Sequence, residues 1–227
     1  MRFLGPKSPL SMFRWDLIYL YAGLNAEEER PDILALAPCV LDLFNQLQAE
    51  RAAFEEAENM LVVALALRAR RDRKVDAKTV ALGGVARATD KAVYGRLFST
   101  ASPTEVTKMA LDRQLQENKR IAKELSALPV DHPHRAQYAE GLDADIEALE
   151  KADAAVDDAE VSLSLARSKV RQVKLHIDKQ RLDVHAKLLQ ILADKKAADS
   201  YFRPGASAPG EAGAGDDEAA PKGGAQG

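Results

Sequence analysis

Histidine often moves protons or binds metals, but the histidines of this chain are not grouped as a site. His176 and His185 are spaced so that they lie on nearly opposite faces of a helix, which makes them poor joint ligands. His132 and His134 flank Pro133, but a zinc ion takes about three or four ligands, so two are too few. We therefore expect no metal site.

Other catalytic motifs are also lacking. The sequence has no Glu-x-x-His motif for a di-iron bundle, and Gly83-Gly84 lacks the strand–turn–helix setting in which glycine holds a phosphate. Residues 140–160 carry many carboxylates, but these are spread around a predicted helix, as on a solvated acidic face. The sequence therefore predicts a protein that is not an enzyme and that has no cofactor.

The densest group of like charges is basic. Its members are Arg68, Arg70, Arg71, Arg73 and Lys74. The structural interpretation is favourable charge at a helix C-terminus, where each basic residue contributes about 0.3–1 kcal/mol at low salt. The functional interpretation is a site for an anion or an acidic partner. No aromatic residue is interleaved with this basic cluster to stack on bases, which weakens a single-stranded nucleic-acid site.

The composition favours long helices over a globular enzyme. Hydrophobic residues, many of them alanine, make up 46% of the chain, aromatic residues 5% and charged residues 30%. The net charge of −3 argues against wholesale electrostatic binding of nucleic acid. The one cysteine, Cys39, excludes a disulfide within the chain, and we expect a reduced, buried thiol in a cytoplasmic protein.

A heptad repeat runs through the last long apolar pattern of the sequence. Its apolar positions are Leu142, Leu149, Val156, Leu163, Val170, Ile177, Val184 and Ile191. Neither glycine nor proline interrupts residues 142–203. The repeat predicts one amphipathic helix over 131–201, about 70 residues and roughly 100 Å long. Asp131 or His132 can cap this helix, with Pro133 in its first turn.

Shorter helices are predicted before this one. Residues 31–73 carry a heptad pattern, and residues 75–98 carry a weaker apolar stripe in which Gly83-Gly84 indicates either a close helix approach or a kink. Ser102-Pro103-Thr104-Glu105 has the pattern of a capping box with proline at the first helical position. It predicts a new helix over 103–127.

Charge selects between two arrangements of these helices. If 75–98 and 103–127 form one bent helix, the fold has three antiparallel helices; if they are separate, it has four in up-down order. The last helix is acidic over 140–160 and basic over 167–187, whereas the first helix runs from acidic to basic. Only the second arrangement sets opposite charges side by side. We therefore expect an all-α, elongated, up-down antiparallel bundle of four helices.

The segments on either side of this bundle, which is expected over 26–202, differ from it. Residues 203–227 are rich in Gly, Ala, Pro and acidic residues and are predicted to be a disordered tail. Residues 1–25 are interpreted as an apolar docking segment. Its stretch 10–24 is too short and too polar to span a bilayer, which takes about 20 apolar residues.

The second half of the last helix adds an apolar face off the heptad repeat, and the N-terminal segment is expected to fold back on it. The competing interpretation is that these surfaces pair with another chain. The residues concerned are Leu175, Leu182 and Leu189 on the helix and Phe13, Trp15, Leu17 and Tyr21 in the N-terminal segment.

The sequence favours a non-enzymatic helical interaction or structural protein that acts as a rod, spacer or adaptor. Its expected partner is a protein, either a second copy or another chain, bound through helical faces, and no small-molecule substrate is implied. One alternative is a peripheral membrane protein that uses residues 10–24, although this segment lacks the basic polar face of such helices. The other is an accessory protein that binds anions or nucleic acid at residues 68–74.

Overall fold

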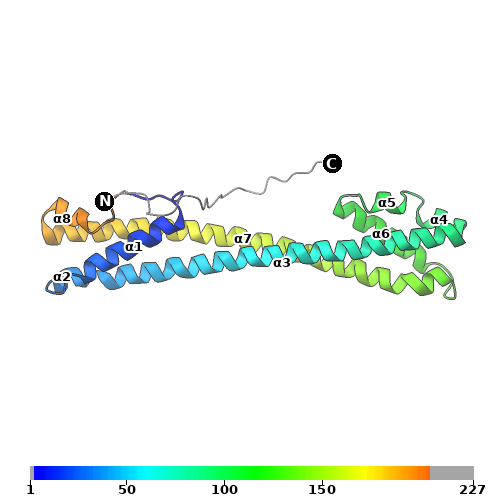
Figure 1. Ribbon diagram of the computed structural model, residues 1–227, viewed down its shortest axis with the longest axis horizontal. Helices are drawn as coiled ribbons and strands as arrows, with labels where there is room; N and C mark the ends of the chain where they lie inside the picture. Colours follow the sequence, from blue (N-terminus) through cyan, green and yellow to red (C-terminus); the bar gives the residue numbers. More distant parts are fainter. Residues whose placement is uncertain (1–2, 205–227) are drawn as a thin grey trace. The chain divides into compact units, whose positions relative to one another are not determined.

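Every regular element that the computed structural model describes is a helix, which confirms the prediction of an all-α protein (Figure 1). The structure describes residues 3–204, so the predicted tail lies outside the described residues from residue 205 onward. The helices are α1 (Leu10–Asn25), α2 (Pro31–Leu34), α3 (Ala37–Thr89), α4 (Lys91–Leu97), α5 (Pro103–Val106), α6 (Leu111–Ser126), α7 (Pro133–Leu192) and α8 (Lys195–Ser200). None of these described helices is both long enough and apolar enough to cross a bilayer.

The chain divides into two compact units. The terminal unit combines residues 1–55 with 165–227, and the central unit consists of residues 56–164. The long helices α3 and α7 contribute residues to both units. Each unit has its own cluster of buried apolar side chains, so the two cores are described separately.

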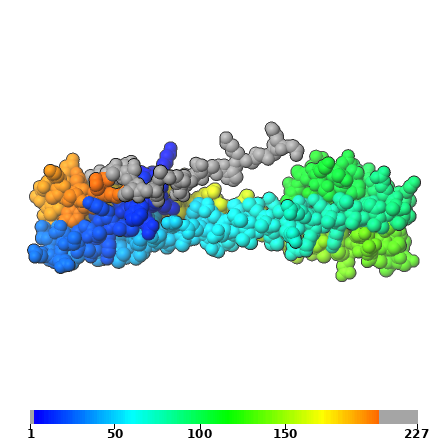
Figure 2. Space-filling view, viewed as in Figure 1, coloured from blue at the N-terminus to red at the C-terminus, as the bar shows by residue number. Residues whose placement is uncertain are grey.

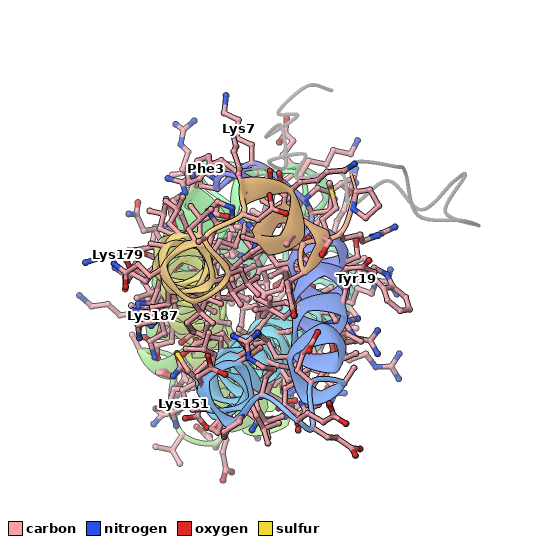
Figure 3. The ribbon with its side chains drawn as sticks, turned by 90° about the vertical axis from the view of Figure 1, so that its left-hand side faces the viewer. Phe3, Lys7, Tyr19, Lys151, Lys179 and Lys187 are labelled. Carbon is pink, nitrogen blue, oxygen red and sulfur yellow. The ribbon has the colours of Figure 1, made fainter. Side chains whose placement is uncertain are left out.

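The core of the terminal unit is built on the apolar face of α1. Phe13, Leu17, Leu20 and Leu24 recur at the spacing of one helix face, and all four are fully buried. They belong to one cluster with side chains from α3, α7 and the segment that includes α8. Figure 3 looks along this unit and shows Tyr19 pointing outward from α1, away from the cluster. The N-terminal segment thus packs within its own chain.

The face of α7 that joins this core is not the predicted one. Leu175 and Leu182 are 47% and 48% exposed, and only Leu189 of the three predicted leucines packs against the cluster. The core instead contains Ile177 and Val184, which belong to the heptad repeat. The expected contact face is therefore wrong, because α1, α3 and α7 surround one shared core rather than α1 attaching to a second face of α7.

The C-terminal end of α7 also differs from the prediction of one helix over 131–201. The helix begins at Pro133 as predicted, but Ala193 has a φ of 51°, and the Asp194 side chain then accepts a hydrogen bond from the backbone of α8. This turn reverses the chain and buries Tyr201 and Phe202 in the terminal core. The buried area gained there explains why the helix stops at a position without glycine or proline.

A buried ionic cluster joins several segments of the terminal unit. Arg181 of α7 is 1% exposed; its Nη1 donates to Oδ1 of Asp178 at 2.7 Å, and its Nη2 pairs with the carboxylate of Asp16 in α1. Asp178 also accepts a hydrogen bond from the backbone N–H of Gly5 at 2.7 Å. The guanidinium carbon of Arg181 lies 5.8 Å from the ring centroid of Phe202. Arg181 and Asp178 together therefore connect α1, α7 and the segments at either end of the described chain.

In the central unit, α3 and α7 are antiparallel, and α6 packs against both (Figure 1). α6 contributes Leu115, Ile121 and Leu125 to the core. These side chains lie in one cluster with Leu82 of α3 and Leu149 of α7. The spacing of the α6 residues makes that helix strongly amphipathic, so burial of its apolar face fixes which side it presents to the two long helices.

Opposite charges meet across α3 and α7 in this unit, as the sequence predicts for antiparallel helices. Arg68 pairs with Asp153 at 3.0 Å. Lys78 pairs with Asp145 at 2.6 Å. Both pairs are partly exposed, so each contributes at most about 1 kcal/mol. Together they favour antiparallel over parallel helices, because a parallel arrangement would form none of these pairs.

The predicted boundaries of the helices before α7 are wrong. The expected break between 31–73 and 75–98 does not occur, because α3 continues to Thr89. The basic residues at this position have high helix propensity, and no proline interrupts them. Asp90 then ends this continuous helix by accepting hydrogen bonds from the first backbone N–H groups of α4. Neither the three-helix nor the four-helix division has these boundaries.

The predicted helix over 103–127 consists of two helices. The capping box is confirmed: the Ser102 backbone N–H donates to Glu105 at 2.7 Å, and the Ser102 side chain accepts from the Glu105 N–H at 3.3 Å. This box starts only the single turn of α5, and α6 begins separately at Leu111. The cap signal thus located a helix start but carried no information on how far the helix runs.

The two adjacent glycines of α3 have different surroundings, which gives a matched test. A Cβ added at Gly83 would lie 2.1 Å from Cγ of Pro103, whereas one added at Gly84 would meet nothing within 4 Å. We expect Gly83→Ala to lower the free energy of unfolding by about 1–3 kcal/mol through overpacking. Gly84→Ala should raise it by about 0.5–1 kcal/mol through helix propensity. Thermal unfolding measures both, and equal shifts would contradict the close approach of α5.

Replacing Arg181 by Met would leave Asp16 and Asp178 buried without the guanidinium. Burial already raises the pKa of Asp16, and Arg181 opposes that shift. We expect Arg181→Met to lower the free energy of unfolding by about 3–5 kcal/mol. Arg171→Met, at an exposed position of the same helix, should change it by less than about 0.5 kcal/mol. Urea denaturation followed by circular dichroism measures the two values, and similar losses would sink the proposed importance of the cluster.

Candidate interaction surface

The histidines take structural positions. His134 is buried, and its Nε2 lies 3.1 Å from Oγ1 of Thr89, which links the start of α7 to the end of α3. His132 lies 3.7 Å from the Asp90 carboxylate, whose pKa is lowered, chiefly by the Val93 backbone N–H that it caps. Sequence reasoning missed these partners, because Thr89 and Asp90 are distant along the chain.

The other two histidines are not brought together. His185 lies 2.7 Å from Asp199 and meets the ring of Phe202 edge-on at a centroid distance of 5.3 Å, whereas His176 is exposed. Within residues 3–204, no group of three or more His, Cys, Asp or Glu side chains is arranged to hold a metal ion. Cys39 is exposed, so the expectation of a buried thiol is wrong.

Two carboxylates share one amide in the central unit. The Nε2 of Gln114, a buried residue of α6, donates to Asp72 at 2.9 Å and to Asp76 at 2.7 Å. Burial, with a smaller contribution from Asp72, raises the pKa of Asp76 from 3.8 to about 6. A paired carboxylate with a raised pKa is a feature of acid–base sites, but Gln114 occupies the space between these two, so the arrangement fastens α6 to α3.

A shallow groove of about 450 Å³ lies between α6 and α7. Its polar lining is mainly acidic, with Asp112, Glu150, Asp153 and Asp157. Two of these carboxylates already have basic partners, since Asp153 pairs with Arg68 and Glu150 with Lys119, which also lines the groove. The groove therefore gives no concentrated charge for a substrate.

The basic cluster at 68–74 lies in the interior of α3, well before its end at Thr89. The explanation by the dipole of a helix C-terminus is therefore wrong. Arg68 is paired with Asp153 across the helix pair, while Arg70, Arg73 and Lys74 are exposed. The exposed members follow directly after the most unusual stretch of the same helix, which is apolar.

Residues 60–67 form an uninterrupted apolar run in α3 (Met-Leu-Val-Val-Ala-Leu-Ala-Leu). Leu61 and Ala64 face inward and pack with Val156 and Ala159 of α7. The large side chains of the apolar run that are exposed are Met60 (52%), Val62 (66%), Val63 (66%), Leu65 (38%) and Leu67 (46%). In Figure 2 the cyan part of α3 lies at the surface of the face in view.

This apolar run is the strongest functional signal in the structure. A helix that is apolar on all sides is normally buried, and large exposed apolar patches mark sites of interaction. Sequence reasoning missed the run because it followed only the heptad positions that face α7. The available signal was the absence of any polar residue over two helical turns.

The seven predicted partner-interface residues are placed differently from one another. Phe13 and Leu17 are fully buried, and Tyr21 is partly buried against the same core, so these three are not a free surface. Trp15 is 43% exposed. With Leu175 and Leu182 also about half exposed, the terminal unit offers scattered apolar side chains rather than a run comparable to 60–67.

Comparisons of the chain with models of protein families, with curated proteins and with solved structures gave no match.

The raised pKa of Asp76 predicts a pH dependence of stability. Between pH 3.8 and about 6, the folded protein holds a proton that the unfolded chain releases, so stability should fall as the pH rises through this window. Asp76→Asn keeps an acceptor for Gln114 and should weaken that fall and raise the melting temperature at neutral pH. Asp143→Asn, at an exposed position of α7, is the control. Identical melting temperatures of the two variants at all pH values would contradict the shift.

Proposed function

We propose that this protein is a non-enzymatic helical interaction protein, a rod, spacer or adaptor of the cytoplasm, that binds a protein partner through residues 60–67. The observation that carries the proposal is the apolar run, in which Val62 and Val63 are each 66% exposed. Burying such side chains is worth about 1.5–3 kcal/mol each, a gain that folding of this chain leaves largely unused. A partner helix packed along α3 would bury these side chains and so gain this free energy.

The surroundings of the run favour a helical partner. α3 is continuous through the run and beyond it on both sides, so it presents a straight row of side chains at helical spacing. Charged residues lie close to both ends of the apolar run: Glu58 precedes it and Arg68 follows it. An apolar centre with charged borders is the usual anatomy of an interface between proteins.

The membrane alternative is supported less well. An interfacial helix inserts its apolar face into the lipid, but the apolar face of α1 is used by the terminal core, where Phe13 and Leu17 are fully buried. The outward residues Trp15 and Tyr19 are each 43% exposed and leave too narrow a stripe for insertion.

The nucleic-acid alternative is also supported less well. Arg68 of the basic cluster is paired with Asp153, and the carboxylate of Asp72 lies within the cluster itself. The acidic Glu56 and Glu58 precede the apolar run on the same helix, so α3 presents no continuous basic surface to a phosphate backbone. The basic residues fit better as the border of the apolar run.

Photo-cross-linking in cells tests the proposed function. A benzophenone amino acid placed at Val63 should give a protein adduct of defined mass, because this position lies in the proposed interface. The adduct should disappear when Met60 and Leu67 are both replaced by Ser. The same probe at Lys151, where the side chain is 81% exposed outside the run, is the control and should give no such adduct. A lipid adduct, or no adduct that depends on Met60 and Leu67, would refute the proposal.

A further inference from the structure

One side of α3 in the central unit carries a second heptad pattern that no part of the chain covers among the described residues. We call it the outer stripe. It consists of Glu56, Met60, Val63, Leu67, Arg70, Lys74, Ala77 and Ala81, and every one of these residues is exposed. Their spacing alternates between four and three residues, which is the spacing of a coiled-coil face. The outer stripe is therefore a preformed face for another helix.

The helices of the central unit leave room along the outer stripe. α7 packs on the face of α3 that holds Leu61 and Ala64, and α6 approaches through Thr79, whose hydroxyl donates to Asn118 at 2.7 Å. At about 100° per residue, Leu61 and Thr79 share one side of α3, and the outer stripe lies roughly 120–150° around the helix from the residues that contact α7 and α6. A helix added there would not displace α6.

The charges of the outer stripe are arranged as a self-complementary series. Glu56 lies at one end, the apolar Met60, Val63 and Leu67 occupy the centre, and basic residues follow. When a second copy is packed antiparallel, its basic residues lie opposite Glu56 of the first copy. Its own Glu56 then lies opposite the basic residues of the first copy. Such a two-fold, isologous contact is the commonest way in which identical chains associate.

Resting on the proposed function, we propose that the partner of the apolar run is a second copy of this chain, paired antiparallel along the outer stripe. In the antiparallel register that sets Glu56 opposite Lys74 of the second copy, Val63 faces Leu67 of that copy. The aliphatic stem of Arg70 covers Met60 of the second copy. Ala77 and Ala81 continue the outer stripe with small side chains that let two helices approach closely.

A parallel pairing of two copies is disfavoured by the same residues. It would set Glu56 against Glu56, Arg70 against Arg70 and Lys74 against Lys74, and like charges at these positions repel. The outer stripe is acidic before its apolar residues and basic after them. Pairing with an unrelated protein would not require this change of sign. The reversal is what selects a second copy over another protein.

Two exposed valines of α3 provide the first test. Val63 is 66% and Val80 47% exposed, but only Val63 lies in the apolar run and on the outer stripe. Sedimentation equilibrium of the full chain should show a dimer, and Val63→Glu should raise its dissociation constant by at least about a hundredfold. Val80→Glu, on the same helix but outside the apolar run, should leave it within about threefold. A monomer at every concentration, or equal effects of the two variants, would overturn the proposal.

Charge exchange tests the antiparallel register. Glu56→Lys alone and Lys74→Glu alone each place like charges together twice per dimer, so each should weaken the dimer about tenfold. The double variant Glu56→Lys, Lys74→Glu restores both pairs and should return the dissociation constant to within about threefold of the original value. Failure of the double variant to recover would overturn this register. Circular dichroism of each variant is the control and should show that its helices are retained.

The two proposals fail in distinguishable ways. If the chain is a monomer and the probe at Val63 still gives an adduct with a different protein that depends on Met60 and Leu67, the second copy is wrong and the interaction surface stands. If the adduct is absent as well, both proposals fail. An adduct of twice the mass of the chain that depends on Met60 and Leu67, together with a dimer weakened by Val63→Glu but not by Val80→Glu, supports both.

Discussion

Two helices that meet through small side chains approach closely but cannot cover one another's flanks, and this constraint governs the central part of α3. Ala64 faces Val156 and Ala159 of α7, a contact too narrow to shield the residues on either side of it. Val62 and Val63 therefore stay in water, although they are as apolar as the core. The stability of this helix pair must come from its packed and charged contacts elsewhere in the central unit, which leaves the apolar run available for binding.

The terminal unit solves a different problem, which is to anchor short segments on a long helix. A one-sided helix such as α1 provides an apolar face, but an apolar face alone sets the position of a helix only loosely. The ion pairs of Arg181 with Asp16 and Asp178 add directional contacts where water is excluded. Because each buried charge is costly without its partners, displacement of any one segment disturbs the whole cluster.

The sequence predicted the features that depend on local signals or on regular repetition. The heptad repeat identified Ile177 and Val184 as core residues, the capping box marked the start of α5 at Pro103, and the charge pattern predicted antiparallel long helices. These signals work because the residues that carry them are close together along the chain or recur at the helical period.

The features that the sequence did not predict depend on distant partners. Ala193 adopts a left-handed conformation although nothing local requires it, because the turn allows Phe202 to reach the terminal core. The sequence does not distinguish Arg181 from the basic residues of a solvated helix face. Only the fold shows that carboxylates surround it. The exposure of Val63 likewise follows from how few helices surround that part of α3, which no short window of sequence contains.

The contacts of the terminal unit also impose an order on biosynthesis. Asp178 meets Gly5 across a separation of 173 residues, and Tyr201 bonds Glu27 at 2.6 Å across 174 residues. Almost the entire described chain must therefore be synthesised before the core of this unit can form. Until then the apolar face of α1 stays exposed. The central unit is continuous in sequence and ends at residue 164, so all of its residues are synthesised before the last segments of the terminal unit.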